Sequence, residues 1–222
     1  MTETTAPGSS ERPEDRRRDG VWWRPDRAAW WMGLLFAVGS LCFAVAAFVS
    51  QWASAPRPAI GVTFFVGSIF FTSAAYLQWR SAPRQPRGTE WRASSIQLAG
   101  TLFFNVSTFA GMKHGFDARQ SDLRVWTPDV FGSICFLVSS QLAYADVCGR
   151  WFCLRPRSLS WRIAALNLVG SIAFGISAVT SLIEPSTQEP VSAAIANAGT
   201  TVGALCFLAG AIMLPLEAAQ AG

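Results

Sequence analysis

Apolar residues gather in six runs along the chain, and most charged residues lie between these runs. Each run has roughly 20 residues, which is enough for a helix to cross a hydrocarbon core of about 30 Å. Backbone groups inside lipid must pair within their own segment, so the runs are expected to be helices. The pattern predicts an all-α polytopic membrane protein with six transmembrane helices over residues 30–49, 59–79, 92–112, 127–147, 161–183 and 193–219.

Each run repeats one short motif, in which a glycine is followed by a phenylalanine four residues later and by small residues at positions +1, +7 and +8. The glycines are Gly39, Gly67, Gly100, Gly132, Gly170 and Gly203, and the phenylalanines are Phe43, Phe71, Phe104, Phe136, Phe174 and Phe207. Offsets 0, +4, +7 and +8 fall on one face of an α-helix. Small residues let helices pack closely in lipid, so we interpret this stripe as a helix–helix interface. The alternative is a chance scatter of glycine and phenylalanine, which six aligned copies disfavour.

Polar linkers divide the apolar region, residues 30–219, into three repeated helical hairpins, 30–79, 92–147 and 161–219. All three begin and end on the same side of the membrane, and parallel repeats of this kind are related by an axis along the membrane normal. The simplest arrangement is a quasi-threefold bundle. Residues 1–29 are charged and poor in apolar residues, which predicts a disordered tail. The tail balances six arginines with six acidic residues, so we expect no nucleic acid partner.

The distribution of basic residues predicts the orientation of the chain. Fourteen of the eighteen Lys and Arg residues lie in the tail and around the linkers before the third and fifth helices. The positive-inside rule therefore places both termini in the cytoplasm. Tryptophans lie at or near the ends of the predicted helices, as expected at a membrane interface. The excess of Arg over Lys, together with abundant Ala, favours a bacterial source and hence the inner membrane.

Several polar side chains fall at membrane depth and are candidates for a polar path or a solute site. They are Gln97, Asn105, Asp129, Asn167, Asn197 and Thr200. The alternative is that they form hydrogen bonds between helices. Asp129 follows Pro128 at the start of a predicted helix, so its expected role is to cap that helix, where the dipole favours a negative charge. Proton handling is the alternative role for this carboxylate.

Residues with catalytic or metal-binding chemistry are sparse. The single histidine, His114, lies in a predicted outer loop, and a metal site needs several ligands together. Cys148 and Cys153 lie at the predicted cytoplasmic end of the fourth helix, where we expect reducing conditions, and no cysteine pair matches a zinc pattern. Phosphate-binding, serine-hydrolase and zinc-protease motifs are lacking. We therefore expect no cofactor, no metal and no enzymatic activity.

The Gly-Ser-x-x-Phe core at Gly67, Ser68 and Phe71, repeated at Gly132, Ser133 and Phe136, resembles the YrhK-like group of small bacterial membrane proteins. The resemblance implies a tandem array of such units, a bacterial membrane location and no catalytic residues. Two functional hypotheses follow. The first is a non-enzymatic scaffold, subunit or sensor whose partners are the bilayer and a membrane protein or second copy of the chain. The second is a transporter or channel for a small, uncharged solute.

Overall fold

The computed structural model describes residues 27–53, 56–84, 88–113 and 115–220. Residues 1–26 of the predicted tail and His114 lie outside this part. The described residues form six long α-helices and no β-strand, with one isolated bridge between Ile183 and Pro190. The long helices are α2 (Ala28–Trp52), α3 (Arg57–Ser81), α4 (Thr89–Gly111), α6 (Thr127–Cys148), α7 (Leu159–Thr180) and α8 (Ala193–Gln220). The predicted all-α class is confirmed.

Five helical segments are long and apolar enough to cross a membrane, which is compatible with an integral membrane protein. They are α2, α3, the continuous segment Ala118–Cys148, α7 and α8. The helix α4 has the length but is less apolar, since it carries Glu90 and Arg92 near its start and Gln97 and Asn105 further along. The number of crossings therefore stays a prediction.

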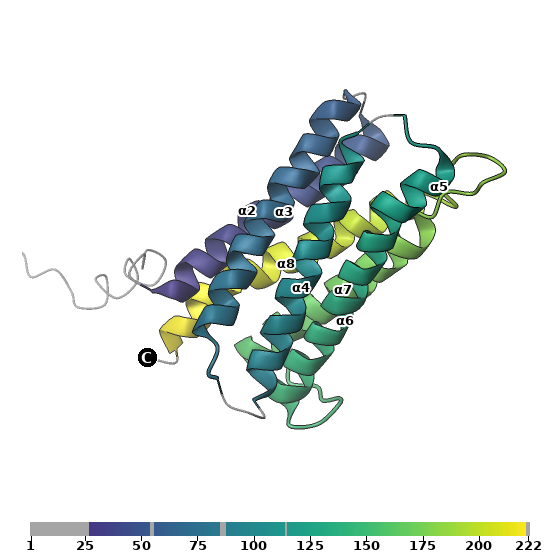
Figure 1. Ribbon diagram of the computed structural model, residues 1–222. Coiled ribbons are helices and arrows are strands. Elements are labelled where there is room, and N and C mark those ends of the chain that lie inside the picture. The colour runs from purple at the N-terminus through teal and green to yellow at the C-terminus, as the bar shows by residue number, and fades with distance from the viewer. Residues whose placement is uncertain (1–26, 54–55, 85–87, 114, 221–222) are drawn as a thin grey trace, which may run out of the picture.

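The long helices form a closed ring in chain order. Each packs against the helix before it and the helix after it, and α8 closes the ring against α2 (Figure 1). Arg27 Nη1 donates a hydrogen bond of 2.9 Å to the carbonyl of Ala218, so the start of α2 and the end of α8 lie together. We call this the terminal end; the end of α3, the start of α4 and the α6–α7 connection also lie there. At the opposite end, which we call the loop end, lie residues 112, 113, 115–126 and 181–192.

Three pairs of glycines bring helix backbones into direct contact. The pairs are Gly39 with Gly67, Gly100 with Gly132, and Gly170 with Gly203, which join α2 to α3, α4 to α6 and α7 to α8. A Cβ atom added at any of these six positions would lie 2.9–3.1 Å from the carbonyl oxygen of the facing glycine. No larger residue fits there without moving a backbone, which makes each pair a close crossing point.

The six repeat phenylalanines are all buried and meet on the bundle axis as two triangles of rings. The first triangle contains Phe43, Phe104 and Phe174, and the second contains Phe71, Phe136 and Phe207. Ring centroids are 6.0–6.5 Å apart in the first triangle and 5.6–6.2 Å apart in the second. Each ring also contacts one ring of the other triangle at 5.0–5.7 Å. We call this cluster the phenylalanine prism; it fills the axis at mid-height.

The helix predicted to begin at Thr127 continues a helical segment that starts earlier. A short helix α5 (Ala118–Ser121) leads into a π-helical segment η1 (Asp122–Trp126) and then into α6. Asp117 caps this segment, because its Oδ1 accepts a hydrogen bond of 2.7 Å from the backbone N–H of Gln120. Asp129 makes no capping hydrogen bond. The predicted cap role for Asp129 is therefore wrong, since the free helix start lies at Asp117.

Candidate functional site

A cavity of about 640 Å³ lies inside the ring of helices at the loop end, and all six long helices contribute to its wall. We call it the vestibule. Its aromatic floor is made by Phe43, Phe64 and Phe174, two of which belong to the prism. Its wall includes Ser107, Thr108, Trp126, Asp129, Ser177, Asn197 and Thr200. A cavity of this size, mostly apolar with a few convergent polar groups, is typical of a small-molecule site.

Most polar groups of the vestibule wall are already engaged within the protein. The hydroxyl of Ser177 donates to the carbonyl of Ala196 at 2.7 Å and lies 2.7 Å from the Thr200 hydroxyl. Asn197 Nδ2 donates to Gln51 Oε1 at 3.1 Å. These bonds hold α7, α8 and α2 together around the cavity.

Asp129 differs from these groups. Its side chain is half-buried on the vestibule wall, and it forms no hydrogen bond or ion pair with any residue that the structure describes. It is also the only carboxylate among the described residues that line the cavity. A partly buried carboxylate without a partner is costly to keep charged, which makes it a functional candidate at membrane depth.

The loop-end connections are tied to one another beside the vestibule. The backbone N–H of Ile183 donates to Asp122 Oδ1 at 3.1 Å, and that of Ala118 donates to Gln188 Oε1 at 3.0 Å. Trp126 Nε1 donates to the carbonyl of Ala178 at 2.8 Å. These bonds fix η1 against α7 and fix both α5 and η1 against the α7–α8 connection, and Asp129 follows η1 within the first turn of α6.

The residues predicted to form a polar path separate into two groups on either side of the prism, while Asn105 is bonded between two helices. Asp129, Asn197 and Thr200 line the vestibule. Asn105 Nδ2 instead donates to Thr72 Oγ1 at 2.9 Å, between α4 and α3. Gln97 and Asn167 are half-buried in the part of the bundle nearer the terminal end and do not line the vestibule. The phenylalanine prism lies between the two groups, so the described residues form no continuous polar path.

Sequence reasoning did not single out several vestibule residues, although the repeat contained a signal for them. Ser107, Thr108 and Ser177 occupy the small positions +7 and +8 of α4 and α7, where α2 has alanines. The repeat pattern predicted only packing surface at all these positions. α4 and α7 run toward the loop end, so the hydroxyl groups at these positions lie beyond the prism, on the wall of the vestibule. Trp126 and Phe64 had no comparable signal.

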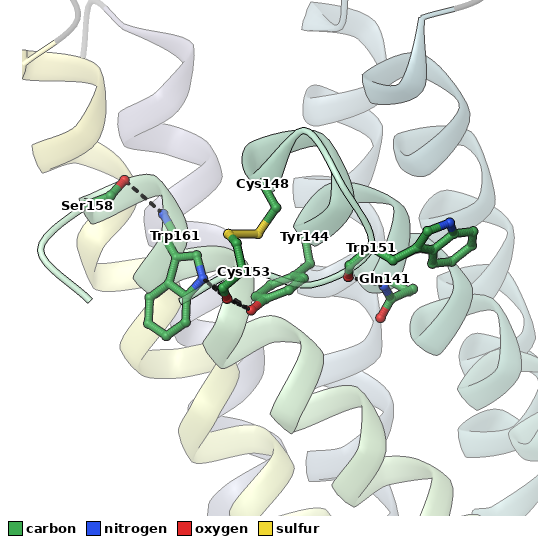
Figure 2. The surroundings of a disulfide bond; sticks show 7 residues. All are labelled: Gln141, Tyr144, Cys148, Trp151, Cys153, Ser158 and Trp161. Carbon is green, nitrogen blue, oxygen red and sulfur yellow. Dashed lines mark hydrogen bonds between the residues drawn. A yellow bond between two sulfur atoms is a disulfide. The ribbon is translucent and has the colours of Figure 1, made fainter. Parts of the chain in front are cut away.

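At the terminal end, a disulfide joins Cys148, the last residue of α6, to Cys153 in the connection to α7 (Figure 2). The carbonyl of Cys153 accepts hydrogen bonds from the Tyr144 hydroxyl and, at 3.1 Å, from Trp161 Nε1. The disulfide and these two aromatic side chains pin the connection against both helices. Disulfides are rare in reducing compartments, so this pair disagrees with the reducing environment expected at this end.

We expect the disulfide to add measurable stability. The bond lowers the conformational entropy of the unfolded chain. For so short a loop, this raises the free energy of unfolding by about 2 kcal/mol. Thermal unfolding of the purified protein, followed by tryptophan fluorescence, should show a lower Tm after reductant is added. The variant in which Cys148 and Cys153 are both serine is the control, and its Tm should not respond. An equal response of both proteins would show that the bond is not formed in solution.

No family model, curated protein or solved structure matches the chain. Within the described residues, no group of three or more His, Cys, Asp and Glu side chains could hold a metal ion. The vestibule, with its unpartnered carboxylate and aromatic floor, is therefore the candidate functional site.

Proposed function

We propose that the protein is a non-enzymatic, multi-pass membrane protein that binds a small solute in the vestibule and acts as a sensor or binding subunit. One observation carries the proposal: a mostly apolar cavity of about 640 Å³, with a few polar groups on its wall, lies at the loop end and is bounded below by the packed phenylalanine rings. A cavity that is open on one side and closed on the other can bind a solute without letting it cross the bundle. Conduction would require the rings to separate.

The proposal includes six crossings, arranged as three repeated hairpins, with both termini in the cytoplasm of a bacterium. The closed ring supports six crossings, because α4 packs between α3 and α6 at the same depth as its neighbours. The excess of Lys and Arg in the tail and around the α3–α4 and α6–α7 connections supports this orientation, whereas the Cys148–Cys153 disulfide at the same end argues against a reducing compartment there. The vestibule would then open to the outside. The resemblance to YrhK-like proteins stays a prediction.

Transport of a small solute is the second candidate function. The carboxylate of Asp129 at membrane depth favours it, since such groups often mark solute or ion pathways. Against it, the prism separates Asp129 and Thr200 from Gln97 and Asn167. Opening the prism by mutation tests whether a solute can pass.

A single cysteine in the vestibule tests the proposed site. In a background where the free cysteines Cys42, Cys135 and Cys206 are alanine, we expect Thr200→Cys to react with a charged, membrane-impermeant methanethiosulfonate. The matched control is Ala204→Cys, one turn deeper on α8, where the side chain is 0% exposed and should not react. Equal reactivity at the two positions, or none at Thr200→Cys, would remove the vestibule from the proposal.

A further inference from the structure

The charged residues of the vestibule lie at different depths, with the two cations nearer its opening than the carboxylate. Asp129 lies three residues before Gly132, whereas Arg57 lies ten residues before Gly67 on α3, which runs in the same direction. The glycine pairs and the phenylalanine triangles hold the six helices at similar levels, so a rise of 1.5 Å per residue places Arg57 about 10 Å nearer the mouth. Lys113 lies beyond the end of α4, further out still. The cations are therefore at the rim and the carboxylate is inside.

Neither rim cation neutralises Asp129. Arg57 is exposed at the first residue of α3, and the Lys113 ammonium lies 5.6 Å from the ring centroid of Phe109, whose side chain is 50% exposed on the outer surface. No ion pair joins either residue to Asp129 within the described part of the chain. The carboxylate therefore has no cationic partner among the described residues that line the vestibule.

The floor of the vestibule suits a positive charge. Phe43 makes edge-to-face contacts with Phe64 at a centroid distance of 5.4 Å and with Phe174 at 6.1 Å, so the three rings lie together below the cavity. The faces of aromatic rings attract cations, most strongly where water is excluded. A carboxylate on the wall above an aromatic surface is the combination that recognises an organic ammonium ion, which has a charged centre and an apolar exterior.

We infer that the ligand of the vestibule carries a positively charged nitrogen, which pairs with Asp129 while its alkyl groups lie against Phe43, Phe64 and Phe174. This inference rests on the proposed function and narrows it from a small solute to an organic ammonium compound. It replaces the uncharged solute expected from the sequence. The ligand holds its charged end inward and presents its other end to the rim.

The experiment compares cations with neutral molecules of the same shape. The probes are choline and benzyltrimethylammonium, and their controls are 3,3-dimethylbutan-1-ol and neopentylbenzene, in which a carbon replaces the charged nitrogen. Each is tested, up to the limit of its solubility in water, for protection of Thr200→Cys from the methanethiosulfonate reagent. We expect at least one cation to protect at about tenfold lower concentration than its isostere.

Two carboxylate variants test whether the charge of Asp129 is what selects the cations. Asp129→Asn keeps the size of the side chain and should abolish the preference for the cations. Asp117→Asn removes the same charge from the nearby helix start, outside the vestibule lining, and should leave the preference unchanged. If Thr200→Cys reacts but the isosteres protect as well as the cations, or no probe protects, or Asp129→Asn keeps the preference, the inference is wrong and the vestibule stands. If Thr200→Cys does not react, the proposed function itself fails.

Discussion

Leucine at position 170 should prevent the six helices from packing into their ring, whereas leucine at position 175 of the same helix should not. A Cβ at Gly170 would lie 3.0 Å from the carbonyl oxygen of Gly203 and 3.1 Å from both the Cβ of Cys206 and the ring of Phe207. Two of these neighbours are fixed to the α8 backbone, so α7 and α8 would have to separate. Overpacking typically costs 1–3 kcal/mol, and we expect about 3 kcal/mol or more here.

Gly175 provides the matched control for this prediction. It lies one and a half turns further along α7, and a Cβ there would meet nothing within 4 Å. Leucine at this position gains helix propensity and lies toward the lipid, so stability should stay the same or rise. The measurements are the size-exclusion profile and the Tm of each variant in detergent. If Gly170→Leu elutes and melts like Gly175→Leu, the glycine pair is not a close crossing point.

The helices themselves were readable from the hydrophobic pattern. The run predicted at 193–219 corresponds to α8 at Ala193–Gln220, and that at 161–183 to α7 at Leu159–Thr180. A long apolar run in a membrane has few alternatives to a helix, so the helical conformation of these runs could be predicted from the sequence. The helical start before Thr127 could not be predicted, because residues 118–126 alternate charged and apolar side chains without a clear helical period.

The division of the polar candidates could have been read from the sequence and was not. Position −3 from each glycine is on the loop-end side of the prism in α6 and α8, but on the terminal-end side in α4 and α7, because these helices run in opposite directions. Asp129 and Thr200 therefore share one level, and Gln97 and Asn167 share another. Position −3 therefore does not mark one level in the bundle. In neighbouring antiparallel helices, the same position relative to the glycine lies on opposite sides of the prism.

Other features needed the assembled structure. The cysteines at 148 and 153 are close in sequence, but spacing alone does not establish a disulfide, and the expected reducing side argued against one. The lack of a partner for Asp129 likewise depends on where Arg57 and Lys113 lie relative to it. Long-range placement of charged side chains does not follow from periodicity, because the same pattern fits several arrangements of neighbouring helices.

Removing two rings from the prism should both destabilise the protein and open its axis. Phe136 is 2% exposed, and its ring centroid lies 5.0 Å from that of Phe104. Each Phe→Ala substitution in a packed core costs about 3–5 kcal/mol, and substitutions of rings in contact need not add. Phe136→Ala alone should therefore lower the Tm clearly. The matched control is Phe131→Ala on the same helix, where the ring is 51% exposed on the outer face.

The double variant Phe104→Ala with Phe136→Ala removes one ring from each triangle, so the gap extends from the vestibule floor toward the terminal end. In liposomes, we expect this variant to pass glycerol in a swelling assay, while the wild-type protein and Phe131→Ala do not. Passage through the wild-type protein would favour transport as its function, because the rings would then separate without mutation. A folded double variant that stays impermeable would contradict the expectation that the rings of Phe104 and Phe136 are needed to close the axis.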